Sequence, residues 1–290
     1  MISIGIPFYN ASDYLEDAIK SVILQSFSIW ELILIDDGST DNSLEIALKY
    51  ASLDCRIRVI SDGENKKLPY RLNQIISEAK FKYIARMDAD DLMDVDRLEK
   101  QFNILEAHPE YDLVTTSMFS IGRNNEVLGK RILVNRQMQA PEILKGLTNL
   151  LHASLLARKE WCERNLYAVE NSLAEDYELW LTSALKNDLK YYVIEEPLYY
   201  YREFENVKKD KMIKGYNTQI SIIRKYSSGV ISGFSKNKII FKFNVKKIIV
   251  YILNYLNMMF ILQNNRVVDV TPQDLEKFER SMLIIENYKS

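Results

Sequence analysis

Three clusters of acidic residues hold the side chains of this 290-residue sequence that are best suited to chemistry. Asp36-Asp37 opens the turn DDGSTD, Asp88-Ala89-Asp90-Asp91 follows an apolar stretch, and Glu175-Asp176-Tyr177-Glu178 starts a segment with helical spacing. Carboxylates packed together repel one another unless a cation or hydrogen-bond donors compensate. The clusters therefore indicate either cation binding and proton transfer, or polar turns that begin helices.

The cluster at 88–91 is a candidate site for a divalent metal. Oxygen ligands suit Mg²⁺ or Mn²⁺, which usually share their coordination between one or two carboxylates and substrate phosphates. An EF-hand is excluded, because Leu92 and Met93 stand where that loop needs a ligand and a glycine. The alternative is a polar turn that caps the next helix. The metal site is favoured over this capping interpretation because a second acidic turn is expected beside this one.

The other two clusters each have a structural alternative. Asp41 or Asn42 would cap a helix after the first turn, but such a cap does not require Asp36 or Asp37. A carboxylate at a strand end can accept hydrogen bonds from a nucleobase or ribose. In the third cluster, one carboxylate could act as a general base, although acidic residues in a first helical turn also favour the helix dipole. Spacing alone does not decide between these two interpretations.

The first half of the chain alternates apolar segments of strand and helix periodicity, which predicts an α/β fold with a mostly parallel, Rossmann-like sheet flanked by helices. Strands are expected at 2–6, 31–35, 57–60 and 83–87, with helices around 15–23, 44–51 and 72–79. Ligands of open parallel sheets bind beyond the carboxyl ends of the strands. The two aspartate clusters follow such strands and should converge on one crevice.

The second half is less regular. Strands are expected near 113–116, 131–134, 153–157 and 191–194, and helices near 141–151 and 175–186. From Glu205 onward the pattern is helical, with a polar break around 227–237. We therefore expect a catalytic domain at 1–204 and a helical C-terminal extension, basic and apolar, at 205–290.

Charge is unevenly distributed along the chain. Residues 205–250 hold eleven of the 38 basic residues and two of the 40 acidic ones, which leaves 27 basic and 38 acidic residues elsewhere. A basic tail on an acidic body suggests an anionic neighbour such as lipid headgroups, with a solvated helix surface as the alternative. The apolar run 248–262 spans 15 residues, fewer than the roughly 20 that a membrane-spanning helix needs.

Compartment and partners are also constrained. We expect no signal peptide, because the sequence begins almost at once with an apolar strand. Cys55 and Cys162 are far apart and fit a reducing compartment. A nucleic-acid partner is not expected, because basic residues are concentrated in the tail and no recognised module is present. GxGxxG and P-loop motifs are absent, which argues against dinucleotide oxidoreductases and P-loop NTPases.

Four segments together resemble a known family. Ile4-Gly5-Ile6-Pro7-Phe8-Tyr9-Asn10, then DDGSTD at 36–41, then the run 83–91 ending in Asp88-Ala89-Asp90-Asp91, then EDYELW at 175–180 are similar in order and spacing to inverting family 2 glycosyltransferases of the GT-A fold. The resemblance covers roughly residues 1–205. It implies transfer of a sugar from a nucleotide-sugar donor, with the DxD motif at 88–90 near the diphosphate.

The resemblance also implies roles in nucleotide binding. Pro7 and Tyr9 would line the nucleoside pocket, and Asp37, together with Asp36, would contact the base, usually uracil of a UDP-sugar. Family members often carry Asn-x-Gly where this chain reads Asn65-Lys66-Lys67. In this chain Lys67 would contact the nucleotide instead.

Further implied roles concern the reaction itself. Asp88 and Ala89 would lie near the ribose or the donor sugar, and Asp90 would bind Mn²⁺ or Mg²⁺. Asp176 would be the catalytic base, and Trp180 would either wall the acceptor side or pack the helix. Tyr201-Arg202 resembles a pair that closes the family's domain near the phosphates.

The predicted function is an inverting hexosyl- or N-acetylhexosaminyltransferase. Its acceptor would be a glycan or lipid-linked glycan in bacterial surface polysaccharide synthesis, such as O-antigen or capsule, at the inner face of the cytoplasmic membrane. One alternative is a catalytically silent protein that binds a nucleotide sugar or glycan. The other is a sugar nucleotidyltransferase, which usually has a glycine-rich phosphate loop near its N-terminus that is absent here.

Overall fold

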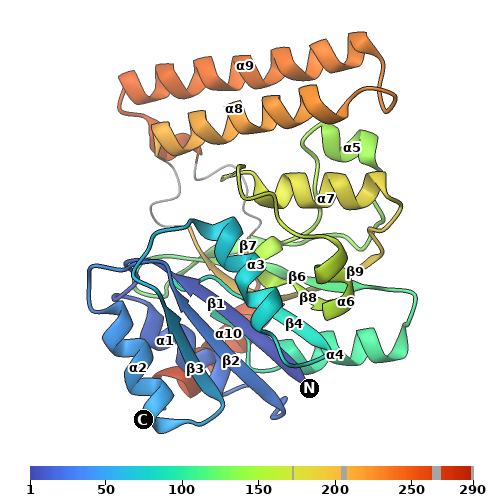
Figure 1. Cartoon of the computed structure of the whole chain (residues 1–290). Helices are drawn as coiled ribbons and strands as arrows, with labels where there is room; N and C mark the ends of the chain where they lie inside the picture. Colours follow the sequence, from blue (N-terminus) through green and yellow to red (C-terminus); the bar gives the residue numbers. More distant parts are fainter. Residues whose placement is uncertain (172, 204–207, 263–268, 289–290) are drawn as a thin grey trace.

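A computed structural model describes residues 1–171, 173–203, 208–262 and 269–288. Its centre is a curved sheet (Figure 1). The strands in chain order are β1 (Ile2–Phe8), β2 (Trp30–Asp36), β3 (Ile57–Ser61), β4 (Tyr83–Arg86), β5 (Leu92–Met93), β6 (Leu113–Ile121), β7 (Val127–Arg131), β8 (Leu156–Arg158) and β9 (Tyr191–Arg202). Within the described residues they pair in the order β3-β2-β1-β4-β8-β6-β9-β5, with β7 beside β6.

The first four strands form the predicted parallel half. β1 lies between β2 and β4, and β3 is next to β2, all in parallel register. Every residue of β1 and β2 is buried, which explains their continuous apolar sequences, since a parallel strand covered by helices on both faces has no solvent-facing side. The carboxyl ends of β1, β2 and β4 therefore meet at one edge, as we predicted from the positions of the acidic motifs.

The second half contains the antiparallel strands. β8 runs antiparallel to both β4 and β6, whereas the long strand β9 runs parallel to β6. The predicted strand at 131–134 is displaced to 127–131, and the one at 153–157 is replaced by a 3-10 turn, η1 (His152–Ser154), and β8. Short strand β5, which was not predicted, pairs with β9 directly after the DxD motif.

Helices cover both faces of the sheet. One face carries α1 (Leu15–Ile23), α2 (Ser43–Leu53) and α4 (Arg97–Ala107), and the other carries α3 (Leu68–Glu78), α6 (Lys159–Arg164) and α7 (Glu175–Leu185). The predicted helix at 141–151 was too long: α5 spans only Ala140–Leu144. Gly146 ends it, with a φ of +76° that suits glycine and an N–H that donates to the carbonyl of Ile143.

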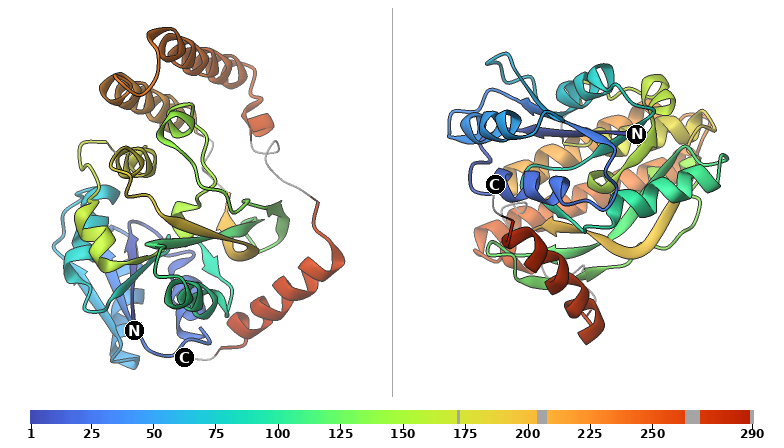
Figure 2. Two further views of the ribbon diagram at one scale, coloured as in Figure 1. Left: turned by 90° about the vertical axis from the view of Figure 1, so that its right-hand side faces the viewer. Right: turned by 90° about the horizontal axis from the view of Figure 1, so that it is seen from below.

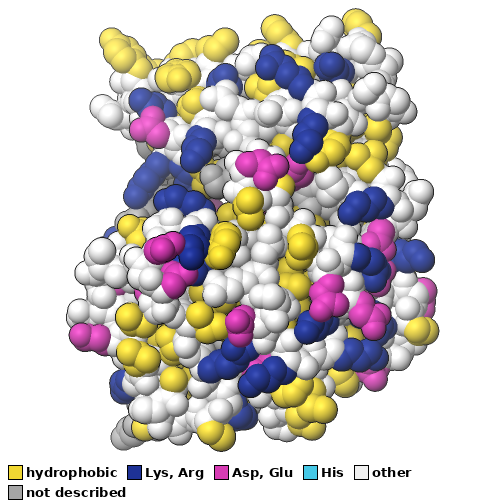
Figure 3. All heavy atoms as spheres, viewed as in Figure 1, with side chains coloured by type: hydrophobic (Ala, Val, Ile, Leu, Met, Phe, Trp, Pro, Cys, Tyr) yellow, Lys and Arg dark blue, Asp and Glu magenta, His cyan; other side chains and the backbone are white. Residues whose placement is uncertain are grey.

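The C-terminal part consists of a helical hairpin followed by a helix that returns to the sheet. α8 (Lys209–Tyr226) and α9 (Gly233–Tyr255) lie side by side above α5 and α7, and the short η2 (Met259–Leu262) follows (Figures 1 and 2). Hydrophobic and basic side chains are prominent over this hairpin (Figure 3). The predicted domain boundary at 204/205 lies outside the described residues.

The last helix belongs with the body. α10 (Pro272–Glu286) packs at the far end of the molecule from the hairpin (Figure 2). Its Phe278, Met282 and Ile285 form a cluster with Leu92, Phe119 and Tyr200 of the sheet. Among the described residues, no helix combines the length and apolar character needed to cross a bilayer.

Candidate active site

A cavity of about 370 Å³ opens at the carboxyl ends of β1 and β4. Its lining comes from the end of β1 with the loop after it, from the DxD motif, and from four residues elsewhere. The first two groups are Pro7, Phe8, Tyr9, Asn10 and Ala11, and Asp88, Ala89 and Asp90; the four others are Tyr14, Arg202, Lys208 and Lys211. Five of the residues that we expected around the donor, Pro7, Tyr9, Asp88, Ala89 and Asp90, thus line one space.

The DxD turn is held from both sides. Arg86 donates from Nη2 to Oδ1 of Asp88 at 2.5 Å. Asp91 is buried, and its carboxylate accepts from the Tyr199 hydroxyl and from the Arg202 backbone N–H, each at 2.7 Å. Asp91 therefore anchors the turn, which leaves Asp88 and Asp90 as the acids of this cluster at the cavity.

Asp90 has the electrostatics of a cation ligand. Burial and the nearby Asp88 carboxylate raise its pKa to about 6, against the opposing effect of Arg202 and Lys211. No group of three or more His, Cys, Asp or Glu side chains among the described residues forms a closed metal cage. Two carboxylates at an open cavity do fit Mg²⁺ or Mn²⁺, which complete their shell with waters and substrate phosphates.

Arg202 fastens the DxD turn to the neighbouring loop. Its Nε donates to the carbonyl of Asp90 at 2.7 Å, Nη1 donates to the carbonyls of Gly122 and Arg123, and Nη2 donates to Oδ1 of Asn125 at 2.6 Å. The guanidinium also lies over the Tyr14 ring, 4.3 Å from its centroid. Most of its hydrogen-bonding capacity is thus spent on the protein, so Arg202 shapes the cavity wall.

The first acidic turn is arranged differently. Asp36 is buried, and its carboxylate accepts from the Ser39 N–H at 2.9 Å and the Ser61 hydroxyl at 2.8 Å. Oδ1 of Asp37 accepts from the Lys66 N–H at 2.7 Å and pairs with Nε of Arg71 at 2.8 Å. Neither residue is among those that line the cavity. Asp36 thus ties the end of β2 to the end of β3, and Asp37 ties it to the segment after β3.

Part of this turn begins the next helix, as the capping interpretation proposed. Asn42 is the N-cap residue of α2 but makes no side-chain cap. Asp41 instead accepts from the Ser43 N–H at 3.0 Å and from the Ser12 N–H at 3.0 Å. Although burial opposes it, these hydrogen bonds and that from the Ser43 hydroxyl lower the pKa of Asp41 to about 2.

Lys67 lies beside Asp37 rather than in the cavity. Its backbone N–H donates to Oδ2 of Asp37 at 3.1 Å, and its φ of +72° with ψ of 160° belongs to a region that almost only glycine adopts. This explains why glycine suits the same position of the motif Asn-x-Gly. The side chain of Lys67 is exposed.

Asp176 stands in the first turn of α7 and shares its surroundings with the DxD cluster. Burial raises the pKa of its carboxyl and Asp88 adds to this, while the Tyr177 N–H, 2.7 Å from Oδ1, and Arg86 oppose it. Burial and Asp176 likewise raise the pKa of Glu175. Arg86 thus pairs with Asp88 and lies within electrostatic range of Glu175 and Asp176, although the two acidic motifs are 84 residues apart in the chain at their closest.

Comparison with protein families settles the class. The Glycosyl transferase family 2 model matches residues 3–166. This chain belongs to glycosyltransferase family 2. Among its relatives are EpsE of Bacillus subtilis (strain 168), named as a glycosyltransferase, at 37% identity over 207 residues (70% of this chain, 73% of EpsE), and the O-antigen biosynthesis glycosyltransferase WbnJ of Escherichia coli, at 29% over 182 residues (62% and 70%).

Solved structures confirm the predicted GT-A fold of this family 2 glycosyltransferase. S. aureus TarS 1–349 in complex with UDP-GlcNAc matches with a TM-score of 0.63 at 17% identity, over 98% of this chain and 80% of that one. The mannosyltransferase PcManGT of Pyrobaculum calidifontis, in complex with GDP-Man and Mn²⁺, matches with a TM-score of 0.58 at 15% identity, over 100% and 76%.

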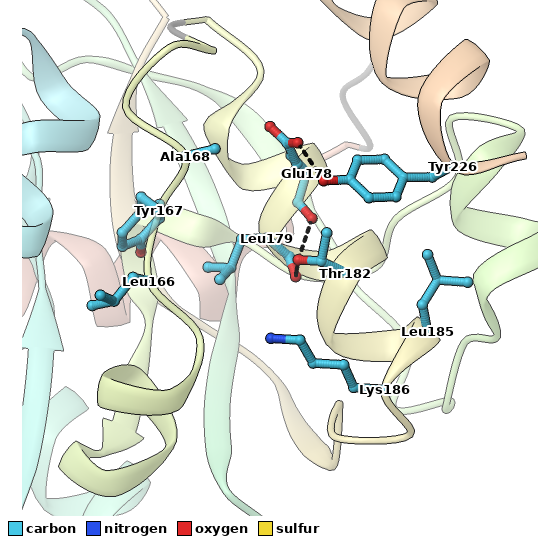
Figure 4. Close-up of a pocket in the computed structure, with 9 residues that line it drawn as sticks. All are labelled: Leu166, Tyr167, Ala168, Glu178, Leu179, Thr182, Leu185, Lys186 and Tyr226. Atoms are coloured by element: carbon cyan, nitrogen blue, oxygen red, sulfur yellow. Dashed lines mark hydrogen bonds between the residues drawn. The ribbon is translucent and has the colours of Figure 1, made fainter.

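A second cavity of about 410 Å³ lies between the segment 166–168, α7 and Tyr226 at the end of α8 (Figure 4). Its acid is Glu178, which is buried and accepts from the Tyr226 hydroxyl at 2.9 Å and the Asn171 side chain at 2.5 Å. Lys225 approaches the same carboxylate at 3.3 Å. In this family 2 glycosyltransferase, Glu178 therefore joins α7 to α8.

Two aromatic residues near Asp176 pack the core. Trp180 is buried, stacks on Trp161 at a centroid distance of 6.1 Å and meets His152 edge-on. Nε2 of His152 lies 2.7 Å from the Tyr167 hydroxyl, and burial together with Arg86 lowers the pKa of His152 well below its ordinary value. A neutral His152 and a packed Trp180 stabilise the start of α7.

Sequence reasoning missed several cavity residues. Tyr14 lies just before α1, and Lys208 and Lys211 come from the start of the C-terminal region. Arg86 was missed as well, although it stands two residues before Asp88 on a buried strand. A charged residue inside an otherwise apolar strand that leads into an acidic motif is the signal that could have found it.

Proposed function

We propose that this chain is an inverting glycosyltransferase, a hexosyl- or N-acetylhexosaminyltransferase that uses a nucleotide-sugar donor, with UDP-sugars as the first candidates. The observation that carries the proposal is the electrostatic contact between the two acidic motifs. Arg86 donates to Asp88, and both lie within electrostatic range of Asp176, so the two motifs belong to one site. A donor phosphate group near Asp88 and Asp90 would then place the anomeric carbon within the range of Asp176.

The donor would occupy the cavity at the end of β1. Tyr9 is exposed there and offers a ring face to the base, while Lys208 and Lys211 bring positive charge for the diphosphate. A carboxylate has about four acceptor positions, of which Asp37 uses three, for Lys66, Lys67 and Arg71. We propose that the fourth accepts from the base, and that Asp36 and Lys67 support this turn from behind.

The same cavity suits a metal-assisted departure of the leaving group. Asp90, helped by Asp88, would hold Mn²⁺ or Mg²⁺. When bound, the ion supplies Lewis-acid neutralisation of the charge that develops on the nucleoside diphosphate.

Asp176 is our proposed general base, because it lies within electrostatic range of Asp88 and because Glu178 of the same helical turn is otherwise engaged. Glu178 has three partners around its carboxylate. Asp176 spends Oδ1 on its own helical turn, and its raised pKa makes it a stronger base than an exposed aspartate. It would take the proton of an acceptor hydroxyl while that oxygen attacks the anomeric carbon from the face opposite the diphosphate. One displacement inverts the anomeric configuration.

The biological setting is also proposed. The acceptor would be a glycan or lipid-linked glycan of a bacterial surface polysaccharide, O-antigen or capsule, met at the inner face of the cytoplasmic membrane. The O-antigen name of one relative supports this setting. The basic C-terminal region would keep the enzyme near a lipid-linked acceptor.

The test is release of nucleoside diphosphate from a panel of nucleotide sugars, with Mn²⁺, with Mg²⁺ and with EDTA. We expect release from one or two donors that EDTA abolishes. Asp176→Asn should keep metal-dependent donor binding by calorimetry but lose roughly 10³-fold in turnover, as expected for loss of a general base. The matched control Glu175→Gln should stay within about tenfold of the parent.

The outcomes separate the alternatives. Donor binding without turnover in the parent, with every acceptor tried, would favour a silent binding protein. Release of pyrophosphate from a nucleoside triphosphate and a sugar phosphate would favour a nucleotidyltransferase. Normal turnover of Asp176→Asn would overturn the assignment of the base.

A further inference from the structure

The outer face of α9 exposes large apolar side chains in a regular line. This line, which we call the outer stripe, consists of Phe234, Phe241, Ile248, Ile252 and Tyr255, whose exposed fractions are 79%, 69%, 56%, 51% and 86%. Isolated exposed apolar residues are ordinary on soluble proteins, but a contiguous set marks an interaction surface. We therefore expect the outer stripe to be covered by a binding partner.

Helix geometry places the stripe opposite the packed face of α9. Phe234, Phe241, Ile248 and Tyr255 recur every seven residues, about two turns, so they lie along one side over a length of roughly 30 Å. The buried residues Ile239, Phe243 and Val250 are offset by about half a turn. The hairpin thus uses one face of α9 for α8 and presents the other outward (Figures 1 and 3).

The charge on the hairpin is almost entirely positive. Residues 209–262 contain ten Lys or Arg and one acidic residue, Asp210 at the start of α8. On α9 itself, Lys238 and Lys242 are exposed on the flank of the stripe. An apolar face bordered by lysines is the pattern of a helix that lies in the headgroup region of a membrane, with its apolar side chains directed into the acyl boundary.

We propose that the outer stripe of α9, with its flanking lysines, binds the surface of an anionic lipid bilayer in the plane of the membrane. The inference rests on the membrane contact in the proposed function, and it names the surface and the lipid charge. It does not depend on the sugar-transfer chemistry.

Two other occupants fit less well. A second copy of this chain would bring a face with the same net positive charge against itself, which opposes pairing through this face. A soluble polyanion would satisfy Lys238 and Lys242 but would leave Phe241 and Ile248 in water. Only an anionic surface with an apolar layer beneath it satisfies both kinds of side chain.

The surface is coupled to the donor cavity through α8. Lys208 and Lys211, at the beginning of α8, line that cavity, and α8 packs along its length against α9. A hairpin held at the bilayer would therefore hold the cavity mouth at a fixed distance from lipid headgroups, where a lipid-linked acceptor is confined.

The experiment is co-sedimentation of the full-length chain with vesicles of phosphatidylcholine, alone or with phosphatidylglycerol, at low and high salt. We expect at least about tenfold stronger partitioning onto phosphatidylglycerol vesicles, weakened by salt. Phe241→Glu with Ile248→Glu should lower partitioning about tenfold or more, and Lys238→Gln with Lys242→Gln should remove much of its salt dependence. The control is Leu48→Glu with Leu53→Glu on α2, two comparably exposed leucines.

The result is read alongside donor hydrolysis and oligomeric state. Undiminished vesicle binding by the Phe241/Ile248 variant, or equal binding to neutral vesicles, would overturn the proposal. A dimer that this variant converts to a monomer, without vesicle binding, would assign the stripe to a second copy. Vesicle binding by a parent that hydrolyses no donor would sustain the membrane surface while removing support for the proposed chemistry.

Discussion

The two acidic turns of this molecule look alike in sequence but are used differently. Asp36-Asp37 and Asp88-Ala89-Asp90-Asp91 both lie at the carboxyl ends of buried parallel strands, β2 and β4. In the first turn the carboxylates meet Ser39, Ser61 and Arg71 within the protein. In the second, Asp88 and Asp90 line the cavity, and burial with like charge raises the pKa of Asp90.

The difference lies in what compensates the charge. The first turn is neutralised internally, so its carboxylates support the fold whether or not a ligand is present. The second is under-compensated, so it gains from a cation that arrives with the substrate. An acidic cluster therefore indicates a cation site only when the protein itself does not supply the opposing charge.

The largest expected effect is that of Asp90→Asn on turnover. Because Asp90 is proposed to hold the metal, nucleoside diphosphate release should fall about 10³-fold or more. The thermal midpoint of the Asp90→Asn variant in EDTA should equal or exceed that of the parent. The reason is that a carboxylate with a raised pKa is unfavourable in its ionised form in the folded state. Release assays and thermal melts check this. Unchanged metal-dependent turnover would contradict it.

The next effect should fall on stability rather than on chemistry. Asp37→Asn breaks the pair with the fully buried Arg71, which among the described residues keeps Asp62 as its ionic partner. We expect the free energy of unfolding to drop by about 2 kcal/mol, measured by urea denaturation. Asp62→Asn, which removes the more exposed partner of Arg71, serves as the matched control and should cost less. An Asp37→Asn variant of normal stability would abolish the distinction between the two turns.

The pH dependence of metal binding sharpens the comparison further. The folded-state pKa of Asp90 is raised to about 6, so protons compete for this carboxylate below about pH 6. Affinity for Mn²⁺ should then fall about tenfold per pH unit between pH 6 and pH 4.5. Without metal the sign reverses: ionised Asp90 destabilises the fold above pH 6, and this penalty is relieved as the pH falls toward 4.

Calorimetric titration with Mn²⁺ at pH 7.5 and pH 5 measures the first effect. Thermal melts of the parent and Asp90→Asn in EDTA over the same range measure the second, because other carboxylates cancel in the difference. A metal affinity independent of pH would show that Asp90 is not the titrating ligand.

The smallest expected effect is at Lys67. Its positive φ costs a non-glycine residue about 1–3 kcal/mol, of which the flexibility of glycine in the unfolded chain returns roughly 1 kcal/mol. Lys67→Gly should therefore be as stable as the parent, or more stable by up to about 2 kcal/mol in urea denaturation. If the side chain also contacts the nucleotide, Lys67→Gly and Lys67→Ala should raise the donor KM equally. If the donor KM rises in neither variant, Lys67 acts through its backbone only.

The sequence predicted the parallel half of the sheet well, because β1 and β2 are buried on both faces and read as unbroken apolar runs. It predicted the second half less well. β5 and β8 are two and three residues long and exist through their partners β9 and β4. α4 was missed because it buries Arg97 and Gln101, which bond each other and hide its apolar period.

The site shows the same limit. Motif spacing predicted Asp88, Asp90 and Asp176 as site residues, since each lies next to a strand end or at a helix start. It could not show that Arg71, 34 residues after Asp37, would reach back to that carboxylate. Nor could it show that Tyr226 would occupy Glu178, 48 residues away. These pairings depend on how α3 and α8 pack, and local periodicity does not encode packing between elements.

The return of α10 to the sheet makes the hairpin an insertion tied at both ends rather than a dangling appendage. Cutting the chain before α8 would also remove α10, which would uncover the apolar surface of Leu92, Phe119 and Tyr200. Deleting α8 and α9 alone, with a flexible connection from β9 to α10, would leave that seal in place. With this topology, we expect that the hairpin α8–α9 could be exchanged between enzymes. Membrane attachment could then be redesigned while the catalytic body stays folded.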